Sequence, residues 1–145
     1  MKSVIAALAL VVAIVVSAPA SAQFKTPEAA VQGLYAIYAK PDSVGFSDRD
    51  APRYFDAALL RMWRAAKFQD ADFFIQGQDF EIKDVKVAPA SISGDKAEAT
   101  VTFRNFGEPS RITYILVQGK DGWRITDARS DSETLRTALK RASKR

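Results

Sequence analysis

The sequence contains no histidine and no cysteine among its 145 residues. Without them, serine–histidine and cysteine–histidine catalysis are excluded, and so are ordinary zinc and haem sites. Disulfide bonds and a lipid-bearing N-terminal cysteine are excluded for the same reason. Glycine-rich phosphate-binding motifs are absent as well. We therefore expect no metal and no cofactor, and carboxylates and tyrosines are the groups left for acid–base chemistry.

The most apolar run of the chain is short and lies at its N-terminus. Lys2 precedes an apolar segment over residues 4–16, and Ala20-Ser21-Ala22 places small residues at positions −3 and −1 of a cleavage site. The run is shorter than the roughly 20 residues of a comfortable membrane span. We expect residues 1–22 to be a cleaved signal peptide. Residues 23–145 then form a single soluble, non-lipidated domain in the bacterial periplasm.

Basic residues outnumber acidic ones by 21 to 17, and the excess gathers at the C-terminus. Residues 136–145 hold five cations and no acid: Arg136, Lys140, Arg141, Lys144 and Arg145. Cations suit the C-terminal end of a helix, and a basic tail also suits weak contact with an anionic membrane surface. The expected periplasmic location argues against a nucleic-acid partner.

The spacing of apolar residues predicts two helices at the start of the domain. Thr26-Pro27-Glu28 has the capping hydroxyl, the proline and the acid of a helix start, and Pro41 predicts an end near Lys40. A second helix is expected from about residue 50, fading at residues 67–69. The apolar positions of the first helix are Val31, Leu34, Tyr35 and Tyr38, and those of the second are Phe55, Leu59, Met62, Trp63 and Ala66.

From residue 80 the apolar residues alternate as in strands. The alternation changes phase between Lys83 and Val85, which predicts a bulge or bend. Further strands are expected over residues 97–103, 112–117 and 123–126, with turns between them, and Ser130–Glu133 has the pattern of a capping box that opens a last helix. The order predicts an α+β fold, with N-terminal helices packed on a curved four-stranded antiparallel sheet and a C-terminal helix.

This order, together with the segments TPEAAVQGLYAIY, GQDF, GDKAEATVTF and GWRITDARS, resembles the cystatin-like or nuclear-transport-factor-2-like α+β superfamily. More narrowly, the chain looks like the bacterial exported family called domain of unknown function 3828. In the superfamily fold, a bent sheet wraps around the N-terminal helix and leaves a cone-shaped cavity. The resemblance implies fold and compartment, and it implies no agreed catalytic residues.

Isomerases and dehydratases of the superfamily use the cavity, and a base there would be Asp79, next to Phe80 at the entrance to the first strand. A carboxylate in an apolar pocket has a raised pKa, which suits a general base. The alternative is a structural Asp79 that caps a turn, with Gly77 at positive φ. The candidate ligand-binding set joins Asp79 to aromatic residues that line a cavity or pack in the core: Tyr35, Tyr38, Trp63, Tyr114 and Trp123.

We expect an exported, soluble and non-catalytic binding or interaction domain of the bacterial cell envelope, with an apolar or aromatic pocket. Its partner would be a small molecule or an envelope protein. Two alternatives stay open: a small-molecule isomerase, dehydratase or hydrolase, and an immunity-type or inhibitor protein. The resemblance also implies that the exposed sheet face can pair with a second copy, so a homodimer is a further expectation.

Overall fold

The computed structural model describes residues 24–66 and 71–145. The predicted signal peptide and the predicted end of the second helix at residues 67–69 lie outside these residues. The elements, in chain order, are α1 (Pro27–Tyr38), α2 (Ala51–Tyr54), α3 (Ala57–Ala65), β1 (Ile82–Val87), β2 (Ser91–Ser93), β3 (Lys96–Asn105), β4 (Glu108–Gly119), β5 (Gly122–Arg129) and α4 (Leu135–Ser143). None of the described helices is long and apolar enough to span a membrane.

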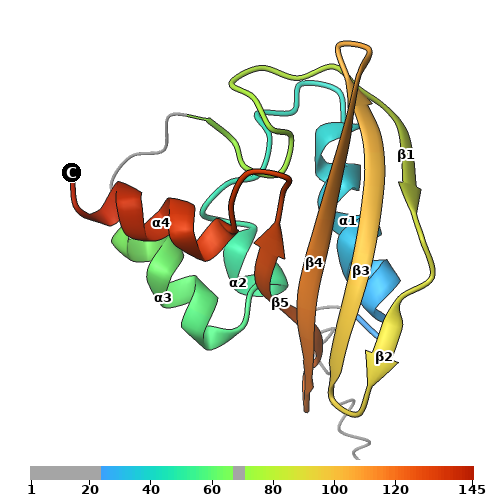
Figure 1. Ribbon diagram of the computed structural model, residues 1–145, viewed down its shortest axis with the longest axis vertical. Coiled ribbons are helices and arrows are strands. Elements are labelled where there is room, and N and C mark those ends of the chain that lie inside the picture. The colour runs from blue at the N-terminus through green and yellow to red at the C-terminus, as the bar shows by residue number, and fades with distance from the viewer. Residues whose placement is uncertain (1–23, 67–70) are drawn as a thin grey trace, which may run out of the picture.

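The predicted α+β class is confirmed, with one strand more than expected. The sheet is antiparallel in the order β1-β3-β4-β5, and the short β2 pairs with β3 beyond the end of β1. Sequence analysis placed β2 inside a turn region. In the structure all three of its residues are exposed, so they lack the one-sided alternation of apolar residues by which a strand is recognised. In Figure 1, α1 lies behind the sheet, while α3 and α4 lie together beyond β5.

Helix α1 begins and ends close to the predicted positions. The Thr26 hydroxyl accepts a hydrogen bond from Ala29 N at 3.1 Å, and Pro27 occupies the first turn, where its missing N–H is no loss. The predicted apolar face is buried against the sheet: Val31, Leu34, Tyr35 and Tyr38 are each at most 5 % exposed. This helix therefore holds two tyrosines of the candidate set in the core.

The prediction of a single second helix is wrong, because the structure has two helices, α2 and α3, in this region. The chain is extended at Phe55, and Asp56 N donates a hydrogen bond to Ile125 O of β5 at 2.9 Å. The Asp56 carboxylate then caps α3 by accepting from Leu59 N at 2.8 Å. Pairing with a strand some 70 residues away, rather than any local signal, breaks the helix.

The predicted bulge in β1 is confirmed. Lys83 pairs with Arg104 and Lys86 pairs with Thr102, so β1 holds one more residue than β3 between these pairs. Asp84, inside the bulge, has a positive φ of 57°. The extra residue turns Val87 toward the covered face opposite Val101 and leaves Lys86 on the open face.

The last helix starts later than the predicted capping box. Thr134, not Ser130, is its cap, since the Thr134 hydroxyl accepts from Thr137 N at 3.2 Å. The carboxylate of Glu133 instead pairs with Arg141 at 2.7 Å, and these hydrogen bonds lower the pKa of Glu133. Arg136 donates to the carbonyl and hydroxyl oxygens of Thr126 at 2.8 Å each. Arg136 and Arg141 of the basic tail thus make contacts within the folded domain. Membrane contact through the tail stays a prediction.

Candidate functional site

Three tyrosines of the candidate set meet in the core between α1 and β4. The Tyr35 hydroxyl donates to Phe74 O at 2.7 Å and lies 3.0 Å from the Tyr114 hydroxyl. Because Tyr35 has one hydroxyl proton, which goes to Phe74 O, Tyr114 is the donor to Tyr35. Burial raises the pKa of all three hydroxyls, those of Tyr35, Tyr38 and Tyr114, so the cluster is neutral.

The carboxylate beside these tyrosines belongs to Asp72, which sequence analysis did not select. Its Oδ2 accepts from the Tyr38 hydroxyl, and its Oδ1 accepts from Phe74 N at 2.9 Å. Burial raises the pKa of Asp72, and the hydrogen bonds from Tyr38 and Phe74 offset part of this rise. The apolar surroundings predicted for an aspartate therefore occur here, seven residues before Asp79.

Asp79 is exposed at the end of the loop that carries the chain into β1. Its Oδ1 accepts from Phe80 N, the next residue, at 2.8 Å. The positive φ that was expected at Gly77 occurs at Gln76, with a value of 54°. The Asn105 amide holds the loop to the end of β3 by donating to Ile75 O at 3.2 Å and Asp79 O at 3.1 Å.

The two tryptophans of the candidate set lie apart from each other. Trp63 of α3 is half-buried, and its ring lies 6.1 Å from that of Phe74 and 5.4 Å from that of Phe46. Its Nε1 donates to Asp48 Oδ1 at 2.7 Å. Trp123 of β5 is 3 % exposed, and its backbone N–H donates to Phe24 O at 2.9 Å.

The interior therefore holds a packed aromatic core around Phe74. This side chain is fully buried, and its ring is stacked on Tyr114 with 6.3 Å between centroids. Every fully buried side-chain nitrogen or oxygen among the described residues has a hydrogen-bond partner. Tyr35, Tyr38 and Tyr114 come together, Trp63 joins them through Phe74, and Asp79 and Trp123 occupy other places. The hydroxyls of the cluster thus serve the core, because other protein groups already take up their hydrogen bonds.

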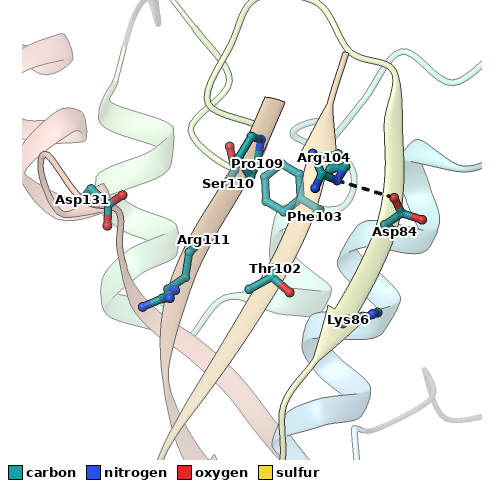
Figure 2. Close-up of a pocket in the computed structure, with 9 residues that line it drawn as sticks. All are labelled: Asp84, Lys86, Thr102, Phe103, Arg104, Pro109, Ser110, Arg111 and Asp131. Atoms are coloured by element: carbon teal, nitrogen blue, oxygen red, sulfur yellow. Dashed lines mark ion pairs between the residues drawn. The ribbon is translucent and has the colours of Figure 1, made fainter. Parts of the chain in front are cut away.

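A groove of about 730 Å³ lies on the opposite, open face of the sheet. Figure 2 shows Thr102 and Arg111 on strands β3 and β4, with the Asp84–Arg104 ion pair on the β1 side. The groove is lined by Asp84, Lys86, Thr102, Phe103, Arg104, Pro109, Ser110, Arg111 and Asp131. These residues come from three strands and from the loop that precedes α4, so the groove crosses the sheet.

Strand register arranges the basic side chains of this groove. Lys86, Thr102 and Arg111 are consecutive cross-strand neighbours, since Thr102 pairs with Lys86 on one side and with Arg111 on the other. Arg104 forms an ion pair with Asp84 at 3.8 Å. Sequence analysis missed this row. The only sign of this row in the sequence is that every second residue of each strand is polar, and this alternation is typical of any solvated sheet face.

Comparison with known proteins gives a similarity in fold. No protein-family model matches the chain, and no curated protein matches it. Among solved structures, the chain is similar to the immunity protein Tai3 in the crystal structure of the type VI native effector–immunity complex Tae3–Tai3 from Ralstonia pickettii. The TM-score is 0.58 at 23% sequence identity, and the match covers 74% of this chain and 96% of Tai3. At this identity the likeness shows the fold alone, and the resemblance to the cystatin-like superfamily and its bacterial family stays a prediction.

Proposed function

We propose that this chain is an exported, non-catalytic protein-binding domain of the immunity type, which binds and neutralises an effector enzyme in the bacterial periplasm. The signal-peptide pattern of residues 1–22 motivates the location. The observation that carries the function is the fold likeness to Tai3, which extends over 96% of that immunity protein. A protein that needs only to bind has no requirement for the histidine and cysteine that this sequence lacks.

The contrast between interior and surface supports a protein partner over a small-molecule ligand. Tyr35 and Tyr114, expected to line a cavity, are 2 % and 0 % exposed, and their hydroxyls are hydrogen-bonded to other protein groups. Tyr35 borders only a hollow of about 260 Å³ between α1 and β1. The open face instead presents a wide polar groove across three strands. A broad surface of this kind suits another protein, whereas small molecules are usually bound in concave sites that enclose most of the ligand.

An immunity-type function predicts that the gene of the effector enzyme lies beside this gene, and co-expression with that enzyme tests the proposal. That enzyme is directed to the periplasm of a Gram-negative host, and growth is followed with and without the full chain. We expect the full chain to restore growth. A variant that lacks residues 1–22 should not, because it stays in the cytoplasm. Size-exclusion chromatography of the two purified proteins should give a single complex.

One further measurement completes the test. The mass of the exported chain should correspond to cleavage after Ala22, and an uncleaved or cytoplasmic chain would contradict the proposed location. If the neighbouring enzyme remains toxic and forms no complex with the correctly exported chain, the immunity-type function is wrong.

A further inference from the structure

We propose that the partner binds across the end of the β3–β4 hairpin and the adjacent groove, with Phe106 as an apolar anchor and Lys86 and Arg111 as contacts for carboxylates. This inference rests on the proposed function and adds to it a binding surface and the chemistry of the partner. We call Phe106, Lys86, Thr102, Arg104 and Arg111 together the hairpin surface.

Phe106 occupies a position where folding alone favours a different residue. It lies in the two-residue turn between β3 and β4 with a φ of 49°, followed by Gly107 with a φ of 81°. Turns with two positive φ values favour asparagine or glycine at the first position, and a bulky aromatic residue is unusual there. The residue is also 57 % exposed. Phe106 therefore combines an unfavourable backbone conformation with an exposed ring that adds little to the stability of the fold. Contact with a partner would bury this ring.

The groove next to Phe106 holds basic side chains that the fold leaves available. Lys86 and Arg111 form no ion pair with any residue in the described ranges 24–66 and 71–145. Arg104, by contrast, donates to Gly107 O at 2.9 Å and pairs with Asp84, so it braces the hairpin turn and connects it to the groove. Figure 2 shows Arg104 between Phe103 and Asp84, with Lys86 farther along β1.

The hairpin surface is small enough for one partner segment to contact all of its residues at once. Phe106 lies in the turn four residues after Thr102, so the two are at most about 13 Å apart along the strand direction. Lys86 and Arg111 lie two strand spacings apart, about 10 Å. Phenylalanine and arginine are enriched at protein interfaces, and most binding energy comes from a few such residues. A patch of this size can hold the centre of an interface.

Charge argues for an acidic partner protein rather than a second copy. The groove has three cations and two carboxylates, and one of the carboxylates, Asp84, is paired with Arg104. A two-fold contact centred on the groove would bring Lys86 and Arg111 of one copy toward the same cations of the other. Asp131 is the one groove carboxylate left to offset these two cations, so the net interaction is repulsive. An effector surface with aspartates or glutamates around an apolar hollow complements the hairpin surface.

Binding to the neighbouring enzyme, measured by calorimetry at low and high salt, tests this surface. The variants are Phe106→Asn and the double variant Lys86→Glu/Arg111→Glu. The controls are Val44→Ser, which removes an exposed apolar side chain elsewhere, and Lys120→Glu, which reverses an exposed charge in the β4–β5 turn. We expect the dissociation constant to rise at least about 10-fold for Phe106→Asn and about 100-fold for the double variant. The controls should change it less than about 3-fold, and the salt dependence should be weaker in the double variant.

The outcomes separate the inference from the proposed function. Wild-type binding that all hairpin variants retain would overturn the hairpin surface and leave the immunity-type function intact. A wild-type chain that binds no neighbouring enzyme would overturn both. Sedimentation analysis without partner should give a monomer. A wild-type dimer that the double variant converts to monomer would assign the surface to a second copy and overturn the acidic-partner proposal.

Discussion

On the covered face of β3 and β4, Val101 and Tyr114 are fully excluded from solvent, while on the open face Thr102 and Arg111 of the same strands contact water. The covered face packs against α1 and buries hydroxyl groups only where each has a partner. The open face has charges, among them Lys86 and Arg111, that form no ion pair with a described residue. The difference indicates that the buried core lies on one side of the sheet, whereas the side chains on the other side, where the proposed binding surface lies, are solvated.

Phe74 offers the strongest test of the covered face. Replacing it by alanine removes the ring at the centre of the aromatic core and should lower the free energy of unfolding by about 3–5 kcal/mol. Urea unfolding followed by tryptophan fluorescence measures this, since Trp63 lies beside Phe74. A loss below about 1 kcal/mol would show that residues 71–80 do not complete the core in solution.

The hydrogen bond from Tyr38 to Asp72 should contribute a smaller amount. Tyr38→Phe leaves a half-buried carboxylate without one of its donors and should cost about 1–3 kcal/mol in the same unfolding experiment. Tyr54→Phe is the matched control, because Tyr54 is also buried but its hydroxyl has no hydrogen bond to a described residue. Equal losses in the two variants would mean that the Tyr38–Asp72 contact adds nothing to stability.

Asp72 should make stability depend on pH in a direction opposite to that of most carboxylates. Its pKa is raised in the folded chain, so the folded state holds the proton more tightly than the unfolded state. Its stabilising contribution is complete below the unfolded pKa of about 4 and is lost as the pH rises through the folded pKa. Relative to Asp72→Asn, the wild-type free energy of unfolding should therefore fall as the pH is raised from acid toward neutrality. A constant difference between the two proteins would refute a raised pKa.

The smallest effect on stability is expected on the open face. Lys86→Ser and Arg111→Ser remove exposed charges without ion pairs to described residues, so each should change the free energy of unfolding by no more than about 0.5 kcal/mol. Urea midpoints of the purified variants measure this. A loss comparable to that of Tyr38→Phe would remove the distinction between the two faces.

Local patterns predicted much of the fold correctly. The helical spacing of Val31, Leu34, Tyr35 and Tyr38 identified the buried face of α1, and the change of phase after Lys83 identified the bulge in β1. These predictions succeeded because periods of 3.6 and 2 follow from the geometry of a helix and a strand. The break at Phe55 and Asp56 escaped prediction, since it depends on pairing with the distant strand β5. The strand β2 escaped prediction for another reason: it forms a hairpin with the nearby β3, but its three exposed residues show no one-sided alternation.

For the candidate site, the sequence supplied the residue types, and only the tertiary structure decided which of these residues lie next to one another. Composition alone excluded histidine and cysteine chemistry, and aromatic spacing marked Tyr35 and Tyr114 as inward-facing. Which carboxylate joins the tyrosines was decided by the loop at residues 71–80, which leaves Asp72 half-buried beside Tyr38 and Asp79 exposed. The row of Lys86, Thr102 and Arg111 likewise arises only when three strands pair in one register. The physical reason is that backbone periodicity acts between near neighbours, whereas burial and charge proximity depend on segments that folding brings together.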